Sequence, residues 1–127
     1  MSKGILVETD LLVEFLLAPS GSTPLLRRLL QTTVCFSTFI QASEIYGTAV
    51  SDDERRIVER PLFGLKILGA SSRYATTIGR LLSSANGSIV HRTAIVAAMA
   101  IESNLPIVTE TFAQTYNGIT GVHIIEA

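Results

Sequence analysis

The sequence predicts an α/β protein, a three-layer α/β/α sandwich around a central, mostly parallel sheet of four to five strands. Short apolar runs without alternation recur along the chain, which is typical of strands buried on both faces. Segments with helical patterning lie between these runs, so each strand is expected to reach the next by a right-handed crossover. Because 127 residues is the size of one ordinary domain, we expect a single domain over residues 1–127.

Composition excludes several classes of protein. The chain is 47% hydrophobic and 17% charged, with a mean hydropathy of +0.42, which excludes a disordered chain. Ten Lys and Arg face eleven Asp and Glu, so any RNA contact must come from a local patch. The single cysteine, Cys35, suits a reducing cytoplasm. No stretch reaches about 18 uninterrupted apolar residues, so a membrane span is not expected.

The first part of the chain predicts two strands and two helices. Residues 5–7 form an apolar run that predicts the first strand. Asp10 is of an N-cap type and precedes a helix over residues 11–17. A second helix is expected to open around residues 22–24, and residues 33–37 are β-branched and aromatic, which predicts the second strand.

The middle of the chain continues the alternation. Residues 38–49 predict a helix that carries Glu44. Residues 52–60 begin acidic and end basic, as the helix macrodipole favours, and predict another helix. Residues 65–68 form a short run that predicts the third strand.

The last part predicts the remaining two helices and two strands. A helix is expected over residues 73–82 and a turn at 86–87, where Asn is followed by Gly. Residues 93–101 are apolar nearly all round and rich in alanine, so this helix must be buried against the sheet. Residues 105–108 and 122–125 predict the last two strands.

Three carboxylates are expected to meet at one edge of the sheet. Glu8 follows the first strand, Asp10 stands two residues later, and Glu44 lies on the helix after the second strand. Ligands of open parallel sheets bind beyond the carboxyl ends of the strands. Converging carboxylates repel one another, and a divalent cation such as Mg²⁺ or Mn²⁺ stabilises such a group.

Three segments, in this order, resemble the PIN domain and most closely its compact VapC-type members. The first is a strand followed by Glu8-Thr9-Asp10, and the second is a helix with a Ser-Glu-Ile-Tyr-Gly cluster around Glu44. The third is the alanine-rich helix after Thr93 with the strand that ends in Val108-Thr109. The resemblance covers nearly the whole chain.

The resemblance implies a Mg²⁺- or Mn²⁺-dependent endoribonuclease fold, often a toxin paired with an antitoxin and usually a homodimer. Glu8 falls where the family has its first Asp, and Asp10 on the third position of that motif. Glu44 matches the helix glutamate directly. These three residues are therefore expected to be the catalytic and metal-binding acids.

The match to the family's acids is incomplete. Thr93 stands where the third acid is expected, directly before the alanine-rich run. After Thr109 the family commonly has Asn or Asp at the position of Thr111, with Glu110 here beside it. Thr93, Thr109 and Glu110 are thus only auxiliary candidates. Because each lost carboxylate weakens a metal site, a bound metal is expected to be weak or absent.

Each candidate residue also has a purely structural interpretation. Glu8 and Glu44 could be solvated acids at a strand end and on a helix surface. Asp10 could cap the helix that follows it, which stabilises a helix by about 1 kcal/mol. Thr109 could bond only within a turn. Basic clusters on the expected helices, such as Arg27 with Arg28, could be solvated or could contact RNA phosphates.

Two functions therefore compete. The first is a metal-dependent ribonuclease with a reduced site of Glu8, Asp10 and Glu44, helped by Glu110. The second is a catalytically inactive PIN-fold module that binds RNA, an antitoxin protein or a second copy of itself. We expect a member of the nuclease fold whose activity is impaired because Thr93 replaces the third acid.

Overall fold

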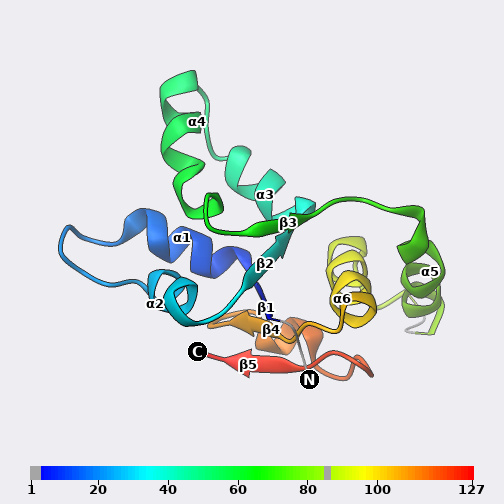
Figure 1. The fold of residues 1–127 in the computed structure, drawn as a ribbon. Helices are drawn as coiled ribbons and strands as arrows, with labels where there is room; N and C mark the ends of the chain where they lie inside the picture. Colours follow the sequence, from blue (N-terminus) through cyan, green and yellow to red (C-terminus); the bar gives the residue numbers. More distant parts are fainter. Residues whose placement is uncertain (1–3, 85–86) are drawn as a thin grey trace.

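A five-stranded, all-parallel sheet forms the centre of the protein (Figure 1). This computed structural model describes residues 4–84 and 87–127, so Asn86 of the expected turn lies outside the described residues. The strands stand in the order β3-β2-β1-β4-β5. Their bounds are β1 Ile5–Val7, β2 Cys35–Thr38, β3 Lys66–Leu68, β4 Ile107–Thr109 and β5 Ile124–Glu126. The expected strand number and direction are confirmed.

The strand order of the sheet has a switch point between β1 and β4. It runs from β1 outward to β2 and β3, then returns to the other side of β1 for β4 and β5. Leu6 pairs with Phe36 on one side and with Ile107 on the other. In parallel sheets such a switch point opens a crevice at the carboxyl ends of the two strands. Glu8 lies at this crevice, because it directly follows the last residue of β1.

Helices cover both faces of the sheet and complete the three-layer sandwich (Figure 1). On one face, α1 and α2 pack beside Ile5 and Val7; on the other, α5 and α6 pack beside Leu6. This opposite facing follows from the two-residue period of a strand. The helices are α1 Thr9–Leu17, α2 Leu25–Thr32, α3 Phe39–Tyr46, α4 Asp52–Val58, α5 Ala75–Ser84 and α6 His91–Ser103. Among the described residues, three short 3₁₀ turns lie in the connections: η1 Arg60–Leu62 after α4, η2 Ser72–Tyr74 before α5, and η3 Ala113–Tyr116 between β4 and β5.

Helix α6 is the most buried helix, as its composition predicts. Its alanines and Val96 and Met99 are buried, and small side chains let the helix backbone lie close to the sheet. Asn104 ends it in the left-handed conformation at φ 54°, which asparagine adopts more readily than most residues. The buried Leu105 then leads directly into β4.

Some element ends differ from the sequence expectation for local reasons. The second strand begins at Cys35 because Thr33 ends α2 as its C-cap. The helix expected from residue 73 begins with the 3₁₀ turn η2. The last helix begins at His91, two residues earlier than expected, so that Arg92 belongs to its first turn. Among residues 4–84 and 87–127, the helices are too short or too polar to cross a bilayer.

Candidate acidic site

Glu8 is a buried carboxylate at the switch point of the sheet. It directly follows β1, its side chain is 0% exposed, and it is the N-cap of α1. The backbone N–H of Thr9 donates to Glu8 Oε1 over 3.0 Å. Burial of a charged carboxylate is costly unless donors surround it, so the remaining partners of Glu8 decide what this site is.

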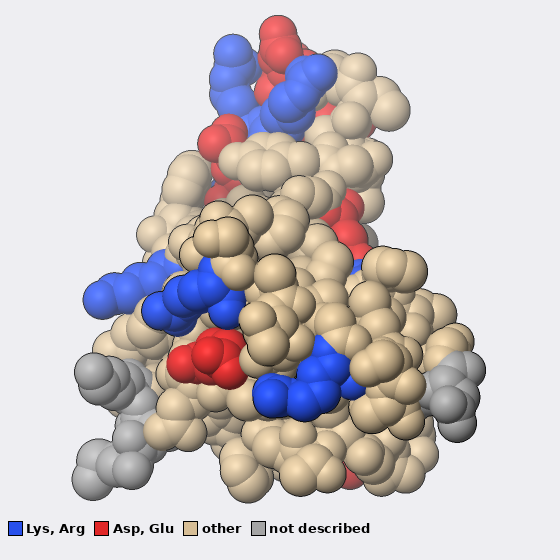
Figure 2. Space-filling model, turned by 90° about the vertical axis from the view of Figure 1, so that its right-hand side faces the viewer, with Lys and Arg blue, Asp and Glu red and all other residues tan. Residues whose placement is uncertain are grey.

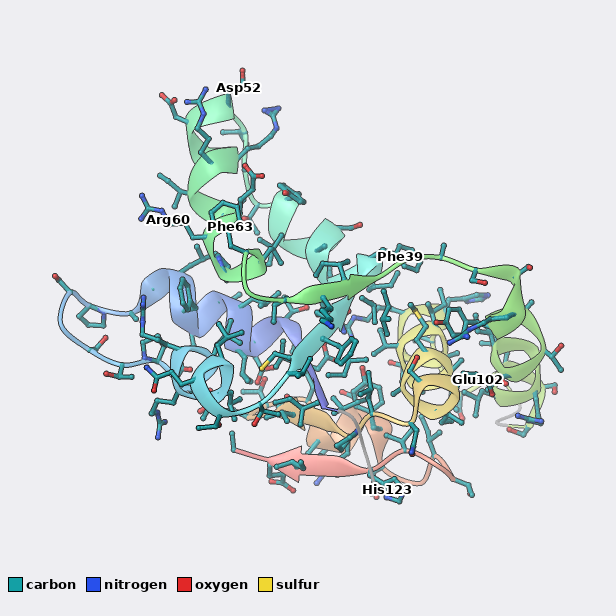
Figure 3. The ribbon with its side chains drawn as sticks, in the orientation of Figure 1. Phe39, Asp52, Arg60, Phe63, Glu102 and His123 are labelled. Carbon is teal, nitrogen blue, oxygen red and sulfur yellow. The ribbon has the colours of Figure 1, made fainter. Side chains whose placement is uncertain are left out.

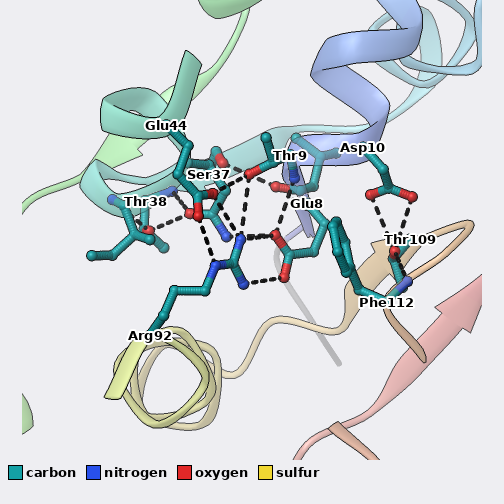
Figure 4. Close-up of polar contacts among 12 residues, drawn as sticks. Glu8, Thr9, Asp10, Ser37, Thr38, Glu44, Arg92, Thr109 and Phe112 are labelled. Atoms are coloured by element: carbon teal, nitrogen blue, oxygen red, sulfur yellow. Dashed lines mark hydrogen bonds and ion pairs between the residues drawn. The ribbon is translucent and has the colours of Figure 1, made fainter. Parts of the chain in front are cut away.

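The guanidinium of Arg92 binds Glu8 in a two-pronged contact (Figure 4). Arg92 Nη2 donates to Glu8 Oε1 over 2.7 Å, and Nη1 donates to Oε2 over 2.8 Å. Such fork-to-fork pairs are among the strongest hydrogen bonds in proteins. Arg92 reaches the site from the first turn of α6, and its side chain is 27% exposed. Solvent therefore reaches the Arg92 side chain of this ion pair but not the Glu8 side chain.

The same guanidinium also binds Glu44. Arg92 Nε donates to Glu44 Oε2 and Nη2 donates to Glu44 Oε1, each over 2.9 Å. The hydroxyl of Thr9 donates to Glu44 Oε1 over 2.6 Å. Arg92 therefore joins a helix of one outer layer to the carboxylates that follow β1 and β2, and supplies one positive charge between two negative ones.

Gln41 and Tyr116 complete the surroundings of Glu8. Gln41 Nε2 donates to Glu8 Oε1 over 3.1 Å, and the Tyr116 hydroxyl donates to Oε2. Gln41 is held in turn by a capping box, in which its Oε1 accepts from the backbone N–H of Thr38, the N-cap of α3. Both oxygens of Glu8 thus already accept from several protein donors.

These contacts lower the pKa values of the two carboxyl groups and raise the pKa of the phenol. Burial raises the pKa of Glu8, but the bonds from Arg92, Tyr116 and Gln41 and the charge of Arg92 together lower it below its usual value. The bond from Arg92 lowers the pKa of Glu44 despite partial burial. The Tyr116 pKa is raised, first by burial and then by the Glu8 charge. At neutral pH the site therefore holds two carboxylates, a guanidinium and a neutral phenol.

Asp10 lies close in sequence but belongs to a different cluster (Figure 4). Its carboxylate accepts from the hydroxyl of Thr109, with oxygen distances of 3.0 and 3.1 Å. The backbone N–H groups of Glu110 and Thr111 donate to Asp10 Oδ2 over 2.7 and 3.0 Å. Asp10 thus ties the loop after β4 to the start of α1, while the N-cap of α1 is Glu8.

The auxiliary candidates are not gathered around Glu8. Thr109 is buried and bonds Asp10, whereas Glu110 is exposed and contributes its backbone N–H to the same carboxylate. Thr93 is buried on α6 and lines a shallow hollow with Val90 and Ile119. The structure therefore brings Glu8 and Glu44 together and places the other predicted residues outside their contact.

The residues of the site do not fit a catalytic divalent metal. Mg²⁺ requires near-octahedral oxygen ligands at about 2.0–2.1 Å, but the oxygens of Glu8 are taken by protein donors and a guanidinium lies between Glu8 and Glu44. The position of the third acid holds Thr93, which has no carboxylate. Within the described part of the chain, no three His, Cys, Asp or Glu side chains are grouped closely enough to hold a metal ion.

Sequence reasoning missed the three residues that complete this site. The Thr38-x-x-Gln41 spacing is a capping-box signal that identifies Gln41 as an ordered residue at the carboxyl end of β2. Arg92 stands next to Thr93, so a cation beside a missing acid was visible in the sequence. Tyr116 lies in a 3₁₀ turn far along the chain and carries no sequence signal for this role.

The sheet order and the layers are those of a PIN-like α/β/α sandwich, and solved structures share this fold. Over 97% of this chain and 98% of the matched chain, it is similar to the crystal structure of VapBC2 from Rickettsia felis bound to a promoter DNA fragment, with 19% identity and a TM-score of 0.77. DNA-bound VapBC from Salmonella typhimurium matches at 21% identity and a TM-score of 0.74, over 99% and 98% of the chains.

A third similar structure is VapBC-5 from Mycobacterium tuberculosis, a member of a family of toxin-antitoxin systems. It matches at 19% identity and a TM-score of 0.65, over 98% of this chain and 99% of that chain. No protein-family model matches the chain, and no curated protein matches it. The fold of VapC-type PIN domains is therefore shared over the full length of the chain, at an identity that establishes fold alone.

We predict that Glu8 makes the stability of the protein sensitive to acid. Its pKa is lowered on folding, so its contribution is complete above the unfolded value of about 4.3 and is lost as pH falls through the lower folded value. Glu8→Gln should cost about 3 kcal/mol at pH 7, because it leaves Arg92 without its buried partner. The difference in free energy of unfolding between wild type and Glu8→Gln should narrow between pH 5 and pH 2.

Urea denaturation at a series of pH values measures this difference. Glu44 titrates in both proteins, so its contribution largely cancels in the comparison. A difference that stays constant down to pH 2 would contradict the lowered pKa of Glu8.

Proposed function

We propose that this chain is a VapC-type PIN-fold protein that acts by binding a partner protein of the antitoxin kind and does not hydrolyse RNA through a divalent metal. The single observation that supports the loss of hydrolysis is the contact of Arg92 with both Glu8 and Glu44. A metal-dependent nuclease uses its metal to polarise the phosphate and to lower the pKa of water. A guanidinium bound on two edges by carboxylates supplies neither an activated water nor an open coordination position.

A groove between the first two helices and α4 supports the binding role. We call it the α1–α4 groove; it has a volume of about 370 Å³. Its lining includes Phe15, Leu16, Pro19, Pro24, Arg27, Ile57 and Arg60. Ile57 is 48% exposed, and Phe63 at the base of α4 is 75% exposed. Figure 3 shows Arg60 and Phe63 at this base and Asp52 at the outer end of α4.

The chemistry of the groove favours a protein segment with apolar and acidic side chains. Ile57 offers apolar contact area, while Arg27 and Arg60 place two positive charges beside it. Large exposed apolar side chains with a polar rim are typical of protein-binding surfaces. The similar structure of VapBC-5 is described as a member of the VapBC family of toxin-antitoxin systems, which agrees with an antitoxin-like occupant.

The charge distribution gives less support to an RNA-coating role. Figure 2 shows Lys and Arg side chains interspersed with Asp, Glu and many uncharged residues on the viewed face, and mixed charges over the arm that carries α4. On that arm Arg55 pairs with Asp52 and Arg56 with Asp53. RNA binding and homodimer formation stay predictions from the family resemblance.

The purified protein should show no metal-dependent cleavage of RNA. A panel of structured RNAs is incubated with the protein in Mn²⁺ and, separately, in EDTA, and the products are separated by electrophoresis. The wild type and Glu44→Gln should leave the RNA intact in both conditions, because the Arg92 guanidinium lies between the two carboxylates that would hold a metal.

An EDTA-sensitive ribonuclease of known activity serves as the positive control for the panel. Cleavage by the wild type that disappears both in EDTA and in Glu44→Gln would overturn the proposal and would establish the first of the two competing functions.

We further expect that a charge placed in the α1–α4 groove abolishes partner binding. Immobilised wild-type protein is exposed to an extract of its source cells, and retained proteins are identified by mass spectrometry. Ile57→Glu should lose the retained partner, because an acid among apolar side chains and beside an acidic ligand is unfavourable.

Ile125→Glu is the matched control, since Ile125 is similarly exposed but lies on β5 at the far edge of the sheet. A partner retained equally by Ile57→Glu and by the wild type would exclude the groove as its docking surface.

A further inference from the structure

The contacts of Arg92 match the shape of a guanidinium group. One edge, formed by Nη1 and Nη2, faces the two oxygens of Glu8 at 2.8 and 2.7 Å. The adjacent edge, formed by Nε and Nη2, faces the two oxygens of Glu44 at 2.9 Å. Two carboxylates placed on adjacent edges of one plane are complementary to a flat fork of donors, and not to a point charge.

Further groups contact the guanidinium besides the carboxylates. The Phe112 ring centroid lies 5.6 Å from Arg92 Cζ, within the range of a cation–π contact. The Tyr116 hydroxyl accepts from Nη1 over 3.1 Å, and Thr9 Oγ1 lies 3.4 Å from Nη2. We call the set Glu8, Thr9, Glu44, Phe112 and Tyr116 the guanidinium cup. Figure 4 labels its first four members.

The two carboxylates of the cup could bind either kind of cation, but the other groups of the cup favour a guanidinium over a divalent metal. Apart from its two carboxylates, it contributes neutral hydroxyls and the face of an aromatic ring. Small hard cations select oxygen ligands in octahedral arrangement and are not selected by an aromatic ring. A planar, weakly hydrated cation gains from all five groups at once.

We propose that the acids of this PIN-type fold form a guanidinium-binding cup, filled from within the chain by Arg92, in place of a divalent-metal site. This goes beyond the proposed function, because it assigns the class of cation that the cup selects. Arg92 is 27% exposed, so the cup is reachable from solvent once that side chain is shortened. A small guanidinium ion added from solution should then occupy the same place.

Chemical rescue of Arg92→Ala tests this assignment. Thermal unfolding followed by circular dichroism is recorded with millimolar ethylguanidinium, ethylammonium or Mn²⁺. Ethylguanidinium should raise the Tm of Arg92→Ala by a few degrees, since a ligand that binds only the folded state stabilises it. Ethylammonium and Mn²⁺ should raise this Tm less, and the Tm of the wild type should not rise with any of them.

Arg92→Ala/Glu44→Gln is the matched control, because it lacks one of the two carboxylate edges. Ethylguanidinium should raise its Tm less than that of Arg92→Ala. A rise with Mn²⁺ that equals or exceeds the rise with ethylguanidinium would overturn the proposal in favour of a metal site. The absence of any rise with ethylguanidinium would also overturn it.

Arg92→Lys provides a second test should Arg92→Ala fail to fold. An ammonium group keeps the charge but cannot face both carboxylates along two edges, so its Tm should fall below that of the wild type. Equal Tm values for Arg92→Lys and the wild type would contradict a cup shaped for guanidinium. A failed rescue would overturn the guanidinium cup and leave the RNA result unchanged, whereas metal-dependent cleavage that is lost in Glu44→Gln would overturn both proposals.

Discussion

The site depends on one ion pair, in which the guanidinium of Arg92 neutralises the fully buried carboxylate of Glu8. An isolated carboxylate at that position would be strongly disfavoured in its charged form. Arg92, the hydroxyl of Tyr116 and the amide of Gln41 keep Glu8 ionised without a metal. The same guanidinium reaches Glu44, so that β1, α3, α6 and the η3 turn meet at one charged group.

The Arg92 side chain fills a crevice at the carboxyl ends of β1 and β4 that the sheet topology itself creates. Strands are added on one side of β1 as far as β3 and then on its other side from β4. A hollow at the carboxyl ends of β1 and β4 is a consequence of this strand order. In this chain the hollow is closed by side chains from the chain itself. The α1–α4 groove lies elsewhere, between helices, and its residue Ile57 is exposed. The charged crevice and the groove to which we assign partner binding are thus separate surfaces.

The fold was predictable from local patterns because burial on two faces leaves a direct signal. Leu6 and its neighbours form a continuous apolar run, and the alanines of α6 allow close packing, so the strand and helix types follow from composition. The site was predictable only in part. Glu8 and Glu44 were identified, but the grouping of Asp10 with Thr109 and the reach of Arg92 depend on side-chain directions across more than 80 residues of sequence. Local spacing carries no information about such contacts.

The most direct test of whether Arg92 replaces a metal is a crystal structure of the wild-type protein soaked in Mn²⁺, with data collected near the manganese absorption edge. We expect no anomalous peak between Glu8 and Glu44, and an Arg92 guanidinium bound to both carboxylates. An anomalous peak at that position, with the Arg92 side chain displaced from it, would contradict the guanidinium cup and would restore the metal-dependent interpretation of the site.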